Sequence, residues 1–416
     1  MYRTYNARPL PRAATPKRSF RKLLFVVVVL LVLIGGYCAV ALLRPLSSVQ
    51  TTITPPVTPS QIKVNIPWPT TSPKEEAAFG ADGYGLLASS GPLAPVPTAS
   101  VTKVITAMSV LNKKPLQPGQ TGPSITMTAH DVDLYNQYVA KEGSVVPVSA
   151  GETITEYQAL QALMLPSANN IADTLAEWAF GNLTAYNQYT NDYVKTLGMT
   201  NTTVTDASGF VPTTVSTARD LVLLGDTALD NPVLTEIINQ KTAEFPGYGT
   251  MHNVNNLLGT AGIRGIKTGN TDEAGGCFLS AADVMIGDKK ITVITAIMSA
   301  PTLGDALRSS LPLIQSAPSQ FQPVRAVRAG QVVGHVTTGW GAASDIIATK
   351  DIQVTAWSGT AIAPLASKAA VQVPTPAHAK AGSLSLKFNG TNQSTDLELA
   401  QAITPPTLWW RLVHPL

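Results

Sequence analysis

The sequence predicts a mixed α/β domain with helices on both faces of an antiparallel sheet and an added helical subdomain. Three observations support this architecture. Residues 75–319 alternate helix-type apolar patterns with short β-rich runs, residues 320–416 contain strand-like runs that predict a small all-β domain, and residues 23–43 are uninterruptedly apolar. A chain of 416 residues is long enough for two or three domains with at least one sizeable core.

The first 43 residues have the composition of a membrane anchor. Residues 1–22 form a basic tail without an acidic residue, and residues 23–43 would span about 31 Å as a helix, which matches a bilayer core. Basic residues before the span place the N-terminus in the cytoplasm and the body outside a single-pass cell-membrane helix. The alternative is a signal peptide cleaved near Ala39-Val40-Ala41, which would also export the body. The cations of the tail are Arg3, Arg8, Arg12, Lys17, Arg18, Arg21 and Lys22.

The composition of the body excludes several classes of function. From residue 45 onward there are 21 Lys and Arg against 26 Asp and Glu, so nucleic-acid binding is not expected. Two distant cysteines, Cys38 and Cys277, exclude a disulfide framework and a thiolate zinc cluster. We expect neither a metal nor a cofactor, because the five histidines are scattered: His130, His252, His335, His378 and His414.

The elements follow in order along the chain. Residues 44–74 are rich in Pro and Thr and predict an extended stalk. A strand is expected within 83–89, and helices are expected within 97–111, 155–165, 167–180, 217–229, 232–240 and 302–317. Three β-rich runs at 262–269, 276–284 and 289–300 predict an antiparallel meander. In the last domain strands are expected within 323–339, 352–357 and 382–388, and "PTLWWRL" (406–412) is interpreted as a final strand.

Three polar patterns stand in order within the α/β part. They are Ser100-Val101-Thr102-Lys103 at the start of a helix, Ser167-Ala168-Asn169 between two helices and Lys267-Thr268-Gly269 at the end of a strand, separated by 67 and 100 residues. Alone, each pattern is more typical of a helix cap, a turn or a solvated lysine. Together, in this order and on these elements, they indicate a catalytic site.

Ser100 and Lys103 have the spacing of a nucleophile and its base. Residues three apart lie on one helix face, and the helix N-terminus favours an anionic oxygen. A lysine can act as base only if burial or a second cation lowers its pKa, and Lys267 is the candidate for that cation. Ser167 could relay a proton to a leaving amine, and Asn169 could hold Lys103 and a substrate amide.

The third pattern has the residue types of a substrate-binding strand. Gly269 lets the backbone approach a substrate closely, and Lys267 with Thr268 can receive a carboxylate.

These motifs resemble those of the penicillin-recognising serine acyltransferases, and more narrowly the low-molecular-mass D-alanyl-D-alanine carboxypeptidases. The resemblance extends through "PTASVTKVITA", "EGSVVPVSAGETITEYQALQALMLPSANNIADTLAE", "LGMTNTTVTDASGF", "STARDLVLLG" and "GIKTGNTDEAGGCFLSA", over about residues 75–318. It implies a β-lactamase/transpeptidase-like sandwich, D-Ala-D-Ala of the peptidoglycan stem peptide as substrate and β-lactams as covalent inhibitors.

The resemblance also implies roles for single residues. Ser100 is the acylated nucleophile, Lys103 the base, and Ser167 and Asn169 the proton relay and orienting residue. The backbone N–H groups of Ser100 and Asn270 form the oxyanion hole. The cleft strand with Lys267 supplies substrate-binding residues: Thr268, Gly269, Asn270, Thr271 and, slightly out of place for a carboxylate ligand, Arg308.

Some residues depart from the family pattern. Ala168 stands where these carboxypeptidases usually have glycine, and Arg264 stands where an acid is common. Arg308 is alternatively a solvated helix residue.

Alternative functions require other residues or motifs. A β-lactamase with Ser-x-Asn also needs a Glu-x-x-Leu-Asn loop, but between Phe180 and Phe210 the only acids are Asp192 and Asp206. A histidine triad has no support, and His130 and His252 fit surface or turn positions. D,D-endopeptidase or transpeptidase activity and a non-catalytic wall-binding protein remain open alternatives. The sequence thus predicts an exported, membrane-anchored serine D,D-carboxypeptidase that uses a Ser100 acyl-enzyme.

Overall fold

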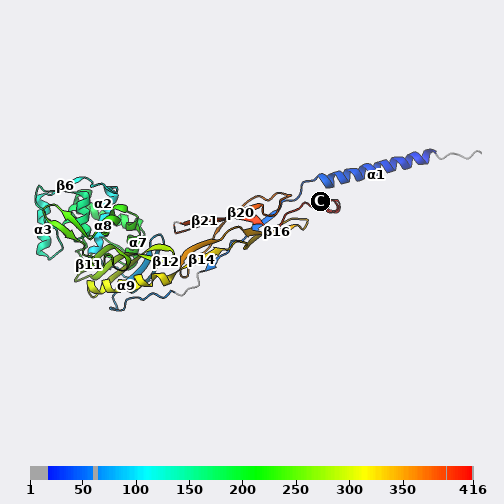
Figure 1. Ribbon diagram of the computed structural model, residues 1–416. Helices are drawn as coiled ribbons and strands as arrows, with labels where there is room; N and C mark the ends of the chain where they lie inside the picture. Colours follow the sequence, from blue (N-terminus) through cyan, green and yellow to red (C-terminus); the bar gives the residue numbers. More distant parts are fainter. Residues whose placement is uncertain (1–16, 60–63, 390, 415–416) are drawn as a thin grey trace, which may run out of the picture.

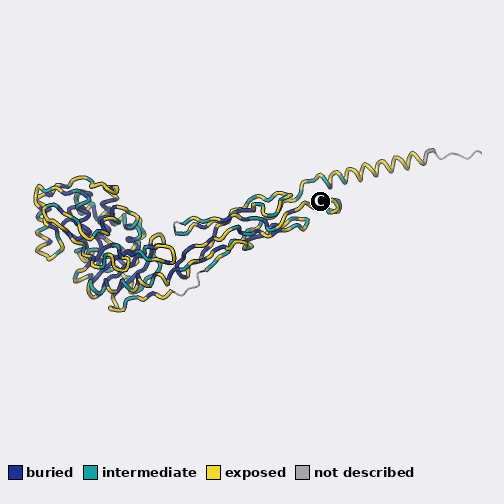
Figure 2. Tube along the Cα trace, viewed as in Figure 1, coloured by how far each residue is buried: buried dark blue, intermediate teal, exposed yellow. Residues whose placement is uncertain are grey.

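The computed structural model describes residues 17–59, 64–389 and 391–414. Figure 1 shows three parts in a row: a rounded α/β part, an elongated β part and the helix α1 (Lys17–Leu43), which extends away from both. Three cations of the expected basic tail, Arg3, Arg8 and Arg12, lie outside the described residues. Most of α1 is exposed (Figure 2), and its segment Phe20–Leu43 is long and apolar enough to cross a membrane.

A five-stranded antiparallel sheet forms the centre of the α/β part, in the order β11-β12-β13-β3-β4. Alternate side chains of its strands enter two cores, as the two-residue period of a strand requires. Phe79 and Phe278 pack with α9 (Leu303–Gln320) on one face, and Ala78 and Leu279 join the larger core beneath α7 (Ala218–Leu229) on the other. The helices and the meander that the sequence predicts are therefore present. The strands are β3 (Glu76–Ala81), β4 (Gly85–Ser90), β11 (Ile263–Thr271), β12 (Gly275–Ile286) and β13 (Lys289–Ala300).

A helical subdomain packs around α2 (Thr102–Lys113), which follows the 3-10 turn η1 (Ala99–Val101). Ten of the twelve residues of α2 are buried, so this helix is the centre of the larger core. The surrounding helices are α3 (Ala129–Ala140), α4 (Glu156–Met164), α5 (Asn169–Phe180), α6 (Leu183–Thr196) and α8 (Pro232–Ile238). Short strands complete it: β5 (Val96–Pro97), β6 (Ser124–Thr126), β7 (Thr153–Thr155), β8 (Val215–Ser216), β9 (Thr242–Phe245) and β10 (Gly249–His252), with a 3-10 turn η2 (Thr260–Gly262).

The elongated part is a β structure around its own apolar core. A six-stranded sheet in the order β1-β15-β16-β21-β20-β19 lies with the two-stranded ribbon β14-β17, and β2 pairs with β18. The strands are β1 (Gln50–Ile53), β2 (Thr58–Pro59), β14 (Phe321–Val327), β15 (Val332–Thr337), β16 (Ala343–Ala348), β17 (Ile352–Trp357), β18 (Ala361–Ile362), β19 (Leu365–Lys368), β20 (Lys380–Phe388) and β21 (Thr391–Leu399).

The segment expected to be a free stalk is extended but partly paired. Residues 50–53 add to the edge strand β15, and residues 58–59 pair with 361–362. Extended Pro- and Thr-rich sequence retains backbone hydrogen-bonding groups, and an exposed sheet edge supplies their partners.

An aromatic cluster joins the two larger parts. The ring centroid of Trp357 lies 5.2 Å from that of Phe79 and 5.2 Å from that of Phe321. The Tyr84 ring stands edge-on to Phe321, with 5.1 Å between the ring centroids. The Tyr84 hydroxyl also donates a hydrogen bond to the carbonyl of Thr355 at 2.8 Å. The cluster therefore connects the central sheet to the ribbon β14-β17.

The interpretation of 406–412 as a strand is wrong. Residues Leu408–Val413 form the helix α10, whose first turn is capped by the Thr407 side chain. An N-cap threonine satisfies an otherwise unpaired helix N–H, and tertiary packing then favours the helix. That packing is on α1: Arg411 donates hydrogen bonds to the carbonyls of Leu42 at 2.6 Å and Arg44 at 3.2 Å.

Candidate active site

The structure brings Ser100 and Lys103 into contact at the start of α2. Ser100 lies in η1 and Lys103 in the first turn of α2, so one helical turn separates them. The Lys103 Nζ is 2.8 Å from the Ser100 Oγ, and the lysine side chain is fully buried. A nucleophilic hydroxyl and an amine are thus within direct proton-transfer distance.

Lys103 Nζ has two further partners, and both can only accept a hydrogen bond. It donates to the Asn169 Oδ1 at 2.6 Å and to the backbone carbonyl of Ser208 at 2.8 Å. A neutral amine has two N–H groups and one lone pair. With both N–H groups directed at these oxygens, the lone pair is left for the hydroxyl proton of Ser100.

Burial lowers the pKa of Lys103 to about 7, although the carboxylates of Asp206 and Asp173 oppose this change. The sequence suggested burial or a second cation, Lys267, as the cause. Burial is the first cause for both lysines, and the charge of Lys103 further depresses the pKa of Lys267, which lies well below its ordinary value. A charged ammonium loses favourable hydration free energy when it is buried, so burial favours the neutral amine of both lysines.

The second motif occupies the turn between α4 and α5. Asn169 begins α5, and its side chain reaches Lys103 from there. Ser167 has a positive φ of 68°, which is uncommon for a residue other than glycine, and its Oγ is buried with no hydrogen-bond partner among the described residues. Neither Lys103 nor Lys267 is hydrogen-bonded to it.

The third motif runs along the edge strand β11, beside η1. A Cβ added to Gly269 would lie only 2.9 Å from the Ser100 backbone nitrogen, so glycine is what allows this strand to pass so closely. The buried Lys267 Nζ donates a hydrogen bond to the carbonyl of Thr268 at 3.1 Å. β11 therefore forms one wall next to the serine.

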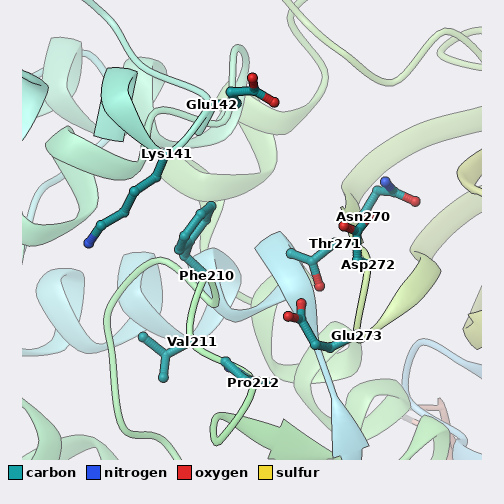
Figure 3. Close-up of a pocket in the computed structure, with 9 residues that line it drawn as sticks. All are labelled: Lys141, Glu142, Phe210, Val211, Pro212, Asn270, Thr271, Asp272 and Glu273. Atoms are coloured by element: carbon teal, nitrogen blue, oxygen red, sulfur yellow. The ribbon is translucent and has the colours of Figure 1, made fainter. Parts of the chain in front are cut away.

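A pocket of about 550 Å³ continues from the end of β11. Asn270 and Thr271, both predicted to bind substrate, line it together with Asp272 and Glu273. Figure 3 shows Thr271 and Glu273 directed toward the 210–212 loop and Asn270 directed away from it, while Lys141 and Glu142, directly after α3, complete the lining. The lining combines the apolar side chains of the 210–212 loop with a few polar side chains, as is usual for a ligand-binding pocket.

Arg308 is not brought to this group. Its side chain is 72% exposed and forms an ion pair with Asp305, one turn earlier on α9. Among the described residues it has no hydrogen bond to the three motifs. The geometry agrees with the alternative interpretation of Arg308 as a solvated helix residue.

Four residues around Lys103 were not identified from the sequence. The carbonyl of Ser208 is one of its partners, and the Asp206 carboxylate shapes that loop by accepting hydrogen bonds from Ser208 Oγ at 2.8 Å and the Phe210 N–H at 2.9 Å. Asp173 accepts from the Tyr138 hydroxyl at 2.8 Å. The one available signal was that Asp173 lies four residues after Asn169, on the same face of a helix.

The fold and the geometry define a class of protein: a serine hydrolase or acyltransferase with a buried lysine in contact with the serine. The chain matches the D-alanyl-D-alanine carboxypeptidase family over residues 82–302, and it belongs to that family. A low-molecular-mass penicillin-binding fold with a β domain after the peptidase part is thus established, as the sequence predicted.

Similar proteins carry two activities in their names. The D-alanyl-D-alanine endopeptidase of Pseudomonas aeruginosa is 30% identical over 51% of this chain and 68% of its own length. The D-alanyl-D-alanine carboxypeptidase DacA of Escherichia coli K12 is 26% identical over 56% of this chain and 57% of its own length. The crystal structure of penicillin-binding protein 5 from Haemophilus influenzae shares the fold, with a TM-score of 0.57 and 20% identity, over 82% of this chain and all of that one.

Proposed function

We propose that this chain is a serine D-alanyl-D-alanine carboxypeptidase that removes the terminal D-Ala from peptidoglycan pentapeptide stems. Family membership and the relatives named carboxypeptidase support the activity. The observation that carries the mechanism is the set of three partners around Lys103 Nζ, because it directs the lone pair of the amine at the Ser100 hydroxyl.

In the first step Lys103 takes the proton of Ser100 as the Oγ attacks the carbonyl carbon of the penultimate D-Ala. With a pKa of about 7, roughly half of the amine is neutral at pH 7, against about 0.03% for an ordinary lysine. The resulting oxyanion would accept hydrogen bonds from the backbone N–H groups of Ser100 and Asn270. The close approach of Gly269 to the Ser100 nitrogen supports this placement.

In the second step the bond between the acyl carbon and the amine of the terminal D-Ala breaks. The leaving amine needs a proton, and the proposed relay from Lys103 is the Ser167 hydroxyl, which is buried without a hydrogen-bond partner among the described residues. Water then attacks the Ser100 ester while Lys103 accepts a proton from that water. The shortened stem is released, and the Ser100 hydroxyl is regenerated when Lys103 returns the proton to its Oγ.

Lys267 and Thr268 are proposed to receive the terminal carboxylate of the substrate. A buried Lys267 with a depressed pKa would regain its charge when an anion arrives, which favours anionic ligands over neutral ones. The rest of the stem would lie along β11 in the pocket of Asn270 and Thr271. A β-lactam, which also carries a carboxylate, would acylate Ser100 in the same cleft.

We further propose that α1 is retained as a single-pass anchor with the catalytic part outside the cytoplasm. The alternative cleavage site at Ala39-Val40-Ala41 lies in the last turns of α1, where Ala41 is buried. The hydrogen bonds from Arg411 to the carbonyls of Leu42 and Arg44 attach the C-terminal helix directly after that site. Intact mass of the membrane-extracted protein tests this, since cleavage would remove about 40 residues.

The experiment that tests the catalytic proposal is intact-protein mass spectrometry after brief exposure to a penicillin, beside Ser100→Ala. We expect one drug adduct on the wild-type chain and none on the variant. A pentapeptide stem ending in D-Ala-D-Ala should lose one alanine only with the wild type. An adduct that persists in Ser100→Ala, or a wild type that neither binds penicillin nor trims the stem, would refute it.

A cross-linked muropeptide belongs in the same assay, because the Pseudomonas aeruginosa relative is named as an endopeptidase. Release of terminal D-Ala that is faster than cleavage of the cross-link supports the carboxypeptidase. The reverse order would reassign the chain to the endopeptidase activity with the same nucleophile.

A further inference from the structure

A buried chain of polar groups leads away from Lys103 through the Ser208 carbonyl. The Tyr138 hydroxyl, on α3, donates to the Asp173 carboxylate on α5 at 2.8 Å and lies 3.4 Å from the Ser208 Oγ. The Ser208 hydroxyl has one proton, which it can donate to Asp206 at 2.8 Å or to the Tyr138 oxygen at 3.4 Å, and the carbonyl of the same serine accepts from Lys103 Nζ. Three elements that are distant in sequence are thus connected behind the base.

Neither Tyr138 nor Asp173 belongs to the three motifs, and both are buried. Burying a carboxylate without a cation in contact costs free energy, so a residue of this kind calls for an explanation. Burial raises the pKa of Asp173 to about 7, while the hydrogen bond from Tyr138 and the charge of Lys103 act in the opposite direction. Asp173 in turn favours the charged form of Lys103.

We propose that Asp173, held by Tyr138, is a positioning residue for the base: its carboxylate orients the Tyr138–Ser208 chain behind Lys103, and its protonation state controls how readily Lys103 becomes neutral. This inference rests on the proposed role of Lys103 as the base of Ser100 acylation. When Asp173 is ionised, its charge holds a proton on Lys103. When Asp173 is protonated, that restraint is lost.

Two nearby titrating groups with opposite charges broaden each other's titration. The proton loss of Lys103 in the wild type is therefore expected to extend over a wider pH range than that of an isolated amine. Other charged or titratable groups interact with Asp173 from the packed elements: Lys103 on α2, Tyr138 on α3, Glu177 on α5, Tyr186 on α6 and Asp206 in the following loop.

The test is the pH dependence of acylation by a fluorescent penicillin, measured on the full-length chain in detergent between pH 5 and 9. For Asp173→Asn we expect the midpoint of the acid limb to move down by about one pH unit and the limb to become steeper, because one opposing charge is gone. Tyr138→Phe should shift the midpoint in the same direction, since Asp173 then loses the hydrogen bond that stabilises its ionised form.

Glu177→Gln is the matched control. It removes an acid from the same helix, one turn further on, where the side chain bonds His130 at 3.0 Å instead of the chain behind Lys103. Because the charge of Glu177 raises the pKa of Asp173, its loss lets Asp173 ionise more readily. We therefore expect the midpoint of this control to stay at or slightly above the wild-type value, opposite to the downward shift of Asp173→Asn.

An Asp173→Asn or Tyr138→Phe enzyme that is uniformly slower, with the wild-type midpoint and steepness, would overturn the inference and leave a packing role. If Asp173→Asn does not fold, Tyr138→Phe alone decides by the same criterion. Absence of acylation in the wild type at every pH would refute the proposed function itself, and with it this inference.

Discussion

The burial of Glu156 should make the protein less stable as the pH rises, and the substitution Glu156→Gln should remove this effect. It is the first residue of α4, only 1% exposed, and both of its carboxylate oxygens lack a hydrogen-bond partner among the described residues. Burial raises its pKa to about 7, with Lys114 weakly opposing. In the unfolded chain the same group ionises near 4.5.

The sign follows from the two pKa values. Between pH 4.5 and 7 the folded protein holds a proton that the unfolded chain releases, so stability falls as the pH rises through this window. The full difference corresponds to about 3 kcal/mol above pH 7. Glu156→Gln keeps the shape of the side chain and cannot ionise. It should therefore raise the stability at pH 8 by up to that amount and change little at pH 5.

Thermal unfolding of wild type and variant at the two pH values measures this. We expect the Tm of Glu156→Gln to exceed the wild-type Tm by on the order of 5 °C or more at pH 8, with near-equal values at pH 5. Asp133→Asn, which removes an exposed acid from α3, controls for loss of one negative charge. An equal gain at both pH values, or the same gain in the control, would refute the reasoning.

Two further predictions concern the cleft and the junction between the parts. Gly269→Ala places a Cβ within 3.0 Å of both the Ser100 nitrogen and the Ala99 side chain. The rate of acylation by penicillin should therefore fall at least about tenfold while the Tm changes little, and wild-type acylation kinetics would contradict this. Trp357→Ala removes the ring that contacts Phe79 and Phe321. It should lower the free energy of unfolding, measured by denaturant titration, by about 3–5 kcal/mol. A loss below about 1 kcal/mol would show that the cluster does not hold the two parts together.

Local sequence signals were sufficient for most elements of the fold. The period of the apolar residues placed α4, α7 and α9 within a few residues of their observed bounds, and the turn residues separated β11, β12 and β13. Such signals depend on neighbours three or four positions away, and they fail where a distant partner decides. "PTLWWRL" has strand-like composition, yet the Thr407 cap and packing on α1 make it the helix α10.

The three motifs could be found from the sequence because each is short and contiguous. Residue type, order and spacing were enough to group Ser100, Lys103 and Asn169, and to propose Lys267 as a nearby cation. The sequence left burial and a second cation open as causes of a lowered pKa at Lys103, because burial is a property of the packed core and leaves no local pattern in the chain. The family resemblance suggested Arg308 for the same site, but the turn of α9 directs it to Asp305 and solvent.

By itself, the sequence indicated the class of chemistry, because a serine, a lysine and an asparagine in this order and on these elements favour an acyl-transferring serine enzyme over a non-catalytic protein. Only the tertiary structure decided which oxygens surround Lys103. The carbonyl of Ser208 and the carboxylates of Asp206 and Asp173 come from segments 70 or more residues beyond the base. Their influence acts through space, where a distance of a few ångströms sets the strength of a hydrogen bond or a charge interaction.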